Sequence, residues 1–215
     1  MIRTKESYYT LSYEVFNMNL IFMRHGEASN NVKEYLSDKE IYWSLLTKKG
    51  QNEVKNSIKS LPAKLDKIYT SPLPRTIQTA HFVYEKYKST EIIIENRLRE
   101  IGYGKYSGQK NNEELDNIRK KQIEGDYFTR FGDYGENKLE IENRLSSFLT
   151  ELSKNNAANS TILIISHGSV TSYMKRILKL KTPHLKTGKI EEFKNVNFTP
   201  VYAHLKTLKS IEEKK

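Results

Sequence analysis

Two short hydrophobic runs, far apart in the chain, both end abruptly in a His-Gly pair. Residues 20–23 (Leu-Ile-Phe-Met) are followed by Arg24 and His25, and residues 162–165 (Ile-Leu-Ile-Ile) lead to His167. A run of this length predicts one buried strand and is too short for a typical helix. Each strand therefore delivers an imidazole to its carboxyl end, which is the edge where open α/β sheets bind their ligands.

The remaining pattern alternates between strand-like and helix-like stretches. Further strands are predicted at residues 65–69, 92–94 and 200–205, and helices at residues 47–61, 75–87, 111–124, 136–152 and 169–180. This alternation predicts an α/β fold, a three-layer sandwich in which helices flank a mostly parallel central sheet.

The pattern also divides the chain into unequal parts. We expect an N-terminal extension over residues 1–18, one domain over residues 19–208 and a basic tail over residues 209–215. The charged stretch at about 105–135 is too polar to build a second core. We interpret it as a small cap insertion over the site.

Composition removes several kinds of chemistry. The 215 residues include no cysteine, which excludes disulfides, thiolate metal sites and a cysteine nucleophile. No hydrophobic run approaches the roughly 20 residues that span a bilayer, and the N-terminus lacks the apolar region of a secretory signal. We therefore expect a cytoplasmic protein with no membrane partner.

The formal net charge of +10 is spread along the chain, so a nucleic-acid-binding arm is not indicated. One acid-free basic stretch, residues 175–189, stands out. Its cations are typical of a helix end that complements the helix dipole. They would also attract an anionic substrate, and the sequence leaves both readings open.

Five charged or titratable side chains follow the predicted strands. Arg24 and His25 follow the first strand, Arg75 the second, Glu100 the third and His167 the strand at 162–165. All five can meet at one edge of the sheet. Arginine presents a planar fork of donors to phosphate oxygens, and a neutral histidine can act as a nucleophile. The set predicts chemistry on a phosphate.

Five short motifs in this order resemble those of the histidine phosphatase superfamily, also called phosphoglycerate-mutase-like. The resemblance covers about residues 19–205. It is carried by Arg24-His25-Gly26-Glu27 with Asn31, Leu46-Thr47 with Gly50, Ser71 to Ala80, Leu98-Arg99-Glu100 with Gly104 and Gly108, and Ser166-His167-Gly168.

The resemblance implies a phosphoglycerate-mutase-like fold and a metal-independent phosphatase without a cofactor. His25 would attack phosphorus and become a phosphohistidine. Arg24, Arg75 and His167 would hold the phosphoryl oxygens, and Glu100 would protonate the leaving alcohol and then activate water.

The resemblance also implies secondary contacts to the substrate. Asn31, Glu27 and the backbone of Gly168 would lie near the phosphate, with Glu27 as the alternative acid to Glu100. The partner would be a small phosphorylated molecule, with phosphoproteins also open, and not nucleic acid. The oligomeric state is not set by the sequence.

Three departures from the family pattern bear on the reaction. Mutases typically follow the acid with Arg-His-Tyr, whereas Ile101-Gly102-Tyr103 follows Glu100 here. Asn30 stands where tryptophan is usual, and Ser107 where an acid is usual. The first departure favours a phosphatase over a phosphomutase, and the other two leave the substrate pocket undefined.

Two alternatives to a phosphatase follow from single features of the sequence. His25-Gly26-Glu27 matches the His-x-Glu of zinc deaminases, but these need cysteine ligands, which the chain lacks. A non-catalytic module that binds a phospho-ligand or nucleic acid stays open as an alternative.

We also expect contacts to the substrate from aromatic and basic side chains of the cap, and a contact at the rim of the site from Trp43. The candidates in the cap are Tyr103, Tyr106, Tyr127, Phe128, Arg130 and Phe131.

Overall fold

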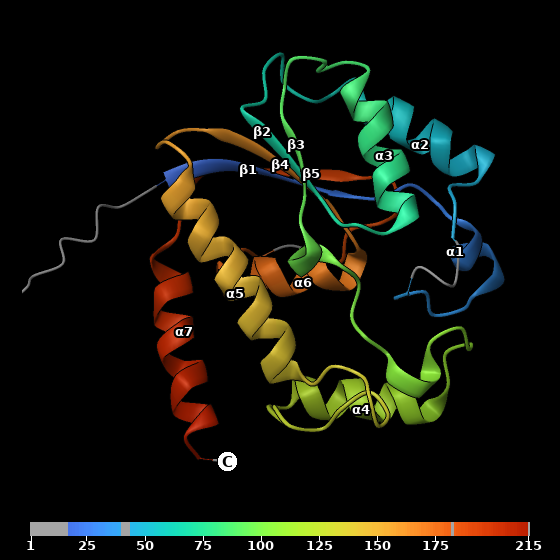
Figure 1. Cartoon of the computed structure of the whole chain (residues 1–215), viewed down its shortest axis with the longest axis vertical. Helices are drawn as coiled ribbons and strands as arrows, with labels where there is room; N and C mark the ends of the chain where they lie inside the picture. The colour runs from blue at the N-terminus through green and yellow to red at the C-terminus, as the bar shows by residue number, and fades with distance from the viewer. Residues whose placement is uncertain (1–16, 40–43, 182, 215) are drawn as a thin grey trace, which may run out of the picture.

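A five-stranded mixed sheet forms the centre of the protein (Figure 1). The computed structural model describes residues 17–39, 44–181 and 183–214. The strands lie in the order β3-β2-β4-β1-β5. The first four run parallel and β5 runs antiparallel to β1. Their bounds are β1 Asn17–Arg24, β2 Lys67–Thr70, β3 Ile92–Ile94, β4 Thr161–Ser166 and β5 Ile190–Asn197.

Helices cover both faces of the sheet, as the three-layer prediction requires (Figure 1). On one face lie α2 and α3, and on the other lie α5, α6 and α7, while α1 and α4 lie beyond the sheet. The bounds are α1 Ser29–Lys33, α2 Lys48–Ile58, α3 Pro74–Tyr84, α4 Glu113–Ile123, α5 Lys138–Asn155, α6 Gly168–Ile177 and α7 Thr199–Glu212; single 3₁₀ turns span Asn96–Leu98 and Gly104–Tyr106.

The alternation of side chains along β1 divides the core in two. Ile21 and Met23 pack with the helices on the α2–α3 side. Leu20 and Phe22 pack with the cluster formed by α5, α6 and α7. Successive side chains of a strand point to opposite faces, so a strand between two helical layers is hydrophobic throughout. Because helices cover both faces of β1, residues 20–23 form an uninterrupted run of apolar residues.

The predicted last strand is wrong. Residues 200–205 belong to α7, in which Pro200 occupies the first turn, a position that needs no backbone donor. The true fifth strand, β5, is an edge strand that the sequence pattern missed. Its pairing with β1 is irregular between Met18 and Leu20, and Asn195 has a φ of 53°. These irregularities break the period of two on which strand recognition depends.

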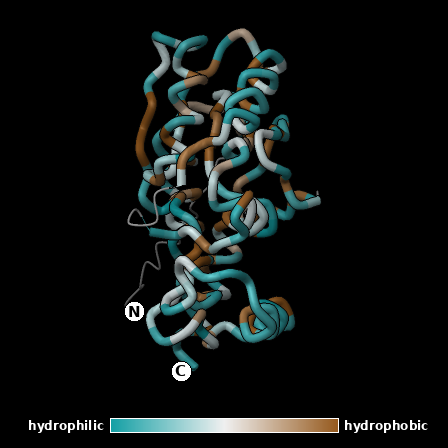
Figure 2. Tube along the Cα trace, turned by 90° about the vertical axis from the view of Figure 1, so that its right-hand side faces the viewer, coloured by the Kyte–Doolittle hydropathy of each residue, from teal (hydrophilic) through white to brown (hydrophobic). Residues whose placement is uncertain are grey.

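The segment at about 105–135 is joined to the main core. Tyr106, Leu115, Ile118 and Phe131 are buried in the same hydrophobic cluster as the α5 side of the sheet. In Figure 2 the lower end of the molecule, where this segment lies, is largely hydrophilic with some hydrophobic positions, and Ile123 at the end of α4 is 72% exposed. α4 therefore presents a mostly polar outer face and a packed inner face.

The expected contact at Trp43 and the first 16 residues of the extension expected over residues 1–18 lie outside the described residues. The last two residues of that extension, Asn17 and Met18, belong to β1. Within the described part of the chain, no helix is both long and apolar enough to cross a membrane.

Candidate active site

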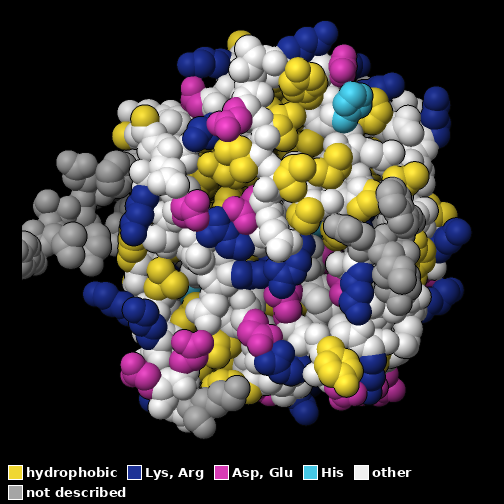
Figure 3. Space-filling model, viewed as in Figure 1, with side chains coloured by type: hydrophobic (Ala, Val, Ile, Leu, Met, Phe, Trp, Pro, Cys, Tyr) yellow, Lys and Arg dark blue, Asp and Glu magenta, His cyan; other side chains and the backbone are white. Residues whose placement is uncertain are grey.

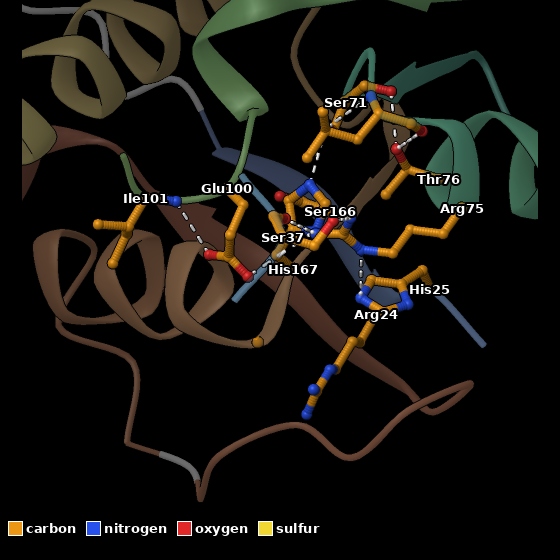
Figure 4. Close-up of polar contacts among 12 residues, drawn as sticks. Arg24, His25, Ser37, Ser71, Arg75, Thr76, Glu100, Ile101, Ser166 and His167 are labelled. Atoms are coloured by element: carbon orange, nitrogen blue, oxygen red, sulfur yellow. Dashed lines mark hydrogen bonds and ion pairs between the residues drawn. The ribbon is translucent and has the colours of Figure 1, made fainter. Parts of the chain in front are cut away.

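The ends of three parallel strands and one connecting loop bring the predicted residues together (Figure 4). Arg24 ends β1, His25 follows it and His167 follows β4. Arg75 lies at the start of α3, five residues after the last residue of β2, and Glu100 follows the turn after β3. A cavity of about 490 Å³ opens at this edge, and Arg24, His25, Arg75 and Glu100 line it.

His25 is held in a single tautomer by its neighbours. A carbonyl only accepts, so His25 Nδ1–H donates to the oxygen of Gly26 at 2.7 Å. Its Nε2 then carries the lone pair and accepts from Arg75 Nε at 3.1 Å. Burial, followed by the charges of Arg75 and Arg24, lowers the pKa of His25 well below its ordinary value. The ring is therefore neutral with an unprotonated Nε2.

Arg75 is the buried hub of the site, with a relative exposure of 1%. Its Nη2 donates to the Ser37 carbonyl at 2.8 Å and to His167 Nδ1 at 3.0 Å, and its Nη1 donates to Ser37 Oγ at 3.2 Å. With the bond to His25, one guanidinium joins two imidazoles. Its fork geometry fixes their separation, which a lysine could not reproduce.

His167 is also neutral, with the opposite tautomer to His25. Because its Nδ1 accepts from Arg75, its Nε2–H donates to Ser71 Oγ at 2.8 Å. The ring lies 5.4 Å from that of His25, centroid to centroid. Burial and then the charge of Arg75 lower the pKa of His167. Ser71 was not among the predicted site residues, although it stands in the quoted motif.

Glu100 lines the cavity, and its surroundings favour the protonated carboxyl group. Its Oε1 accepts from the Ile101 N–H at 3.0 Å, and its Oε2 lies 3.9 Å from His167 Nδ1. Burial raises the pKa of Glu100, and the charge of Arg75 opposes this only in part. A buried carboxyl group near neutral imidazoles thus retains its proton to a higher pH than an exposed one.

Glu27, the alternative acid, lies outside the cavity lining. Its Oε1 accepts from Thr47 Oγ1 at 2.8 Å and its Oε2 pairs with Lys49 Nζ at 2.6 Å. These bonds lower the pKa of Glu27, with the Lys49 bond first. Its environment therefore favours the carboxylate, opposite to that of Glu100.

Asn31 and Gly168 both line the cavity. Asn31 Oδ1 accepts from the Ala28 N–H at 2.9 Å, which ties α1 to the end of the first motif. Gly168 begins α6, directly after His167. The structure thus brings Arg24, His25, Asn31, Arg75, Glu100, His167 and Gly168 to one place and leaves Glu27 at its edge.

The expected substrate contacts from the cap need correction. Among those six residues only Tyr103 lines this cavity. Arg130 instead pairs with Glu140 at 2.5 Å, on the surface. Phe131 is buried in the core. The cavity wall is completed by residues that the sequence did not mark as site residues, namely Asn30, Glu34, Tyr35, Leu36, Ser37, Lys110, Asn111, Ser169 and His184.

The side chains of the basic stretch at 175–189 lie in different surroundings. Lys175 is buried and pairs with Glu191 at 2.6 Å, so it stabilises the packing of α6 on β5. From the sequence, His184 is expected to be an ordinary, partly exposed histidine, but in the structure its Nε2 lies 3.2 Å from Arg24 Nη1. In the described residues there is no cluster of three or more His, Asp or Glu side chains arranged to hold a metal ion.

Together, the fold and the site define an α/β protein in which two guanidinium groups and two neutral imidazoles meet at one edge of the sheet. The chain belongs to the histidine phosphatase superfamily (branch 1), whose family model matches residues 20–203. The phosphoglycerate-mutase-like expectation is thereby confirmed at the level of family and fold.

Two curated relatives and one solved structure illustrate the likeness. The chain is 34% identical over 106 residues to a 2,3-bisphosphoglycerate-dependent phosphoglycerate mutase of Thermoplasma acidophilum, covering 49% of this chain and only 52% of that relative. It is 32% identical over 157 residues to phosphoserine phosphatase 1 of Hydrogenobacter thermophilus, covering 70% of this chain and 71% of that relative.

The solved structure is that of phosphoserine phosphatase from Entamoeba histolytica in complex with 3-phosphoglyceric acid. It superposes with a TM-score of 0.68 at 24% identity, covering 85% of this chain and 95% of that one. At this identity the likeness supports the fold alone.

Proposed function

We propose that the protein is a metal-independent phosphomonoester hydrolase that works through a phosphohistidine. The observation that carries the proposal is the tautomer of His25. Its Nδ1–H is engaged by Gly26, so that Nε2 is unprotonated and its lone pair, which accepts from Arg75 Nε in this structure, becomes the nucleophile once a phosphoryl group replaces that donor in a cavity lined by two guanidinium groups. A neutral, oriented imidazole among cations suits nucleophilic attack on a phosphoryl group.

The first half-reaction transfers the phosphoryl group to the enzyme. His25 Nε2 forms a bond to phosphorus while the bond from phosphorus to the alcohol oxygen breaks. Glu100 delivers its proton to that oxygen, so the leaving group departs as an alcohol. Arg75, Arg24 and His167 surround the transferred group, and the guanidinium groups balance its charge in the transition state.

The second half-reaction returns the enzyme to its starting state. The Glu100 carboxylate takes a proton from water as the water oxygen attacks phosphorus. The bond from phosphorus to His25 Nε2 breaks, and inorganic phosphate leaves. His25 is again neutral and Glu100 is again protonated, so no proton or electron is left unaccounted for.

A phosphomutase is the second candidate, because one of the two relatives is a mutase. Hydrolysis is favoured by the residues after the acid. Ile101 is buried with a relative exposure of 4%, and Gly102 has no side chain, so neither offers a cation to a sugar acid. Apart from Arg24 and Arg75, the basic side chains that line the cavity are Lys110 and His184.

A binding module without catalysis is the third reading, and the distribution of charge speaks against nucleic acid as its ligand. On the face seen in Figure 3, acidic side chains are interspersed with basic ones. Ion pairs such as Arg97–Glu95 and Arg99–Glu136 account for part of this mixture. Non-specific nucleic-acid binding rests instead on a continuous basic surface.

The deciding experiment is a panel of phosphomonoesters assayed with and without a chelator, on wild type, His25→Ala and His81→Ala. His81 lies on α3 with its side chain 70% exposed, so its variant is the matched control. We expect phosphate release by wild type and His81→Ala, unaffected by chelator, and its loss in His25→Ala. Acid-labile phosphate should be trapped on the first two alone.

Other outcomes of the same panel overturn the proposal. Rapid turnover of phosphoglycerate that depends on a bisphosphoglycerate, with little phosphate release, identifies a mutase. No labelling and no release, together with salt-dependent retardation of an oligonucleotide, identifies a binding module.

A further inference from the structure

Arg24 is oriented by a loop rather than by a carboxylate. Its Nη1 donates to His184 Nε2 at 3.2 Å and to the Leu185 carbonyl at 3.1 Å, both in the loop between α6 and β5. No ion pair to Arg24 is found among the described residues. In Figure 4 its side chain extends away from the other labelled residues toward this loop. Neutral acceptors thus orient Arg24 without a direct ion pair among the described residues.

The hydrogen bonds around His184 allow only one tautomer. A guanidinium has donors alone, so His184 Nε2 accepts and is unprotonated. Its Nδ1–H then donates to Ser172 Oγ at 3.2 Å. The Ser172 hydroxyl in turn donates to the Gly168 carbonyl at 2.9 Å, which leaves its oxygen free to accept. Each donor in this series of hydrogen bonds, from Arg24 through His184 and Ser172 to Gly168, therefore meets an acceptor.

The same ring is packed against the start of α6. A Cβ added to Gly168 would lie 2.5 Å from Nε2 of His184 and 3.1 Å from Cζ of Arg24. A Cβ atom essentially never comes within 3.0 Å of another side chain, so a side chain at Gly168 would displace the ring of His184, and it would also crowd the guanidinium of Arg24. His184 also lines the cavity, and the charges of Arg24 and Lys175 add to burial in lowering its pKa.

We propose that His184 is a positioning residue of the active site, which fixes the guanidinium of Arg24 relative to the bound phosphoryl group through Nε2. The loop between α6 and β5 thereby becomes part of the anion site. This inference rests on the proposed function, since it assumes that Arg24 contacts a phosphoryl group. It predicts that the acceptor at position 184, and not the ring itself, is what the site requires.

The test measures the binding of orthovanadate and inorganic phosphate by calorimetry. His184→Phe keeps a ring without an acceptor, and His184→Gln restores an acceptor near the position of Nε2. We expect His184→Phe to weaken binding about tenfold, because a bond to a charged group is lost while Leu185 still holds Arg24. His184→Gln should stay within about threefold of wild type, and the control His81→Phe should be unchanged.

A double-mutant cycle shows whether His184 acts through Arg24. In an Arg24→Ala background, His184→Phe should change anion binding less than about twofold, since the partner is already gone. An undiminished effect in that background would overturn the proposal, as would equal losses in His184→Gln and His184→Phe.

A second variant keeps the proposal testable if His184→Phe does not fold, as judged by thermal melting. Ser172→Ala leaves the ring of His184 in place and removes the acceptor that fixes its tautomer, so anion binding should weaken only when Arg24 is present.

Calorimetry also distinguishes failure of the catalytic proposal from failure of the proposal about His184. If wild type hydrolyses no phosphomonoester yet binds these anions as described, the catalytic proposal fails and the role of His184 stands.

Discussion

Replacing Glu100 by glutamine removes the proposed acid with little change of shape. Glutamine keeps an Oε1 that can accept from the Ile101 N–H, the contact that orients the carboxyl group at 3.0 Å. It has no proton to give to an alkoxide. General acid catalysis contributes about 10²–10⁴-fold to a rate, so the phosphorylation of His25 by an alkyl phosphate should slow by this factor.

The loss should depend on the leaving group. Nitrophenolate is a weak base that departs without a proton, so phosphorylation by p-nitrophenyl phosphate should slow less than about tenfold in Glu100→Gln. Hydrolysis of the phosphoenzyme still lacks its base, and acid-labile phosphate should accumulate on His25. Rapid-quench measurement of the nitrophenol burst and of bound phosphate separates the two steps.

The pH profile gives a second readout with a definite sign. Burial lowers the pKa of His25 and raises that of Glu100, so the active form with neutral His25 and protonated Glu100 exists between the two. Activity on an alkyl phosphate should fall as the pH rises through the raised pKa of Glu100. This fall should be absent in Glu100→Gln.

Glu27→Gln is the matched control, because Glu27 is the other candidate acid and lies outside the cavity lining. We expect it to retain the leaving-group dependence of wild type. If Glu100→Gln slowed both substrates equally while Glu27→Gln slowed the alkyl phosphate selectively, the assignment of Glu100 would be refuted.

Three further predictions follow from the packing of the site. Arg75→Lys cannot bridge two imidazoles, so kcat/KM should fall at least about 100-fold, with a melting curve as the check on folding. Lowering the pH from about 7.5 to about 5.5 should destabilise the protein by about 1 kcal/mol for each of His25 and His167, because the unfolded chain takes up protons near pH 6.5 that the native state refuses; urea unfolding of His25→Gln should show a shallower dependence, and an unchanged slope would contradict a depressed pKa for His25. Lys175→Met should cost about 2 kcal/mol of unfolding free energy because it breaks the ion pair between the buried Lys175 and Glu191, and undiminished stability in thermal melts would mean that this ion pair only offsets its own desolvation.

Much of the central fold follows from short-range patterns. The strands β1 and β4 are uninterrupted apolar runs because both of their faces are covered, and Thr47 caps α2 through a bond from the Gly50 N–H, as its position in the sequence suggests. The edge strand β5 was missed because its exposed positions and irregular pairing with β1 remove the alternation. The strand expected at 200–205 was a misreading of the apolar face of α7.

The residues of the candidate site also differ in whether the sequence predicts them. His25, Arg75, Glu100 and His167 could be predicted because each follows a strand whose carboxyl end must lie at one edge. His184 could not, since it stands in a loop with no periodic pattern.

What the sequence determined by itself is the family, the parallel core and the identity of the groups that meet at its edge. Because the strands are parallel, their carboxyl ends lie at one edge of the sheet, which brings these groups to the same side of the molecule. Only the tertiary structure decided the tautomers of His25 and His167, the opposite pKa shifts of Glu100 and Glu27, and the walls of the cavity. These depend on burial and on hydrogen-bond partners from distant segments, such as Ser37, which no local pattern encodes.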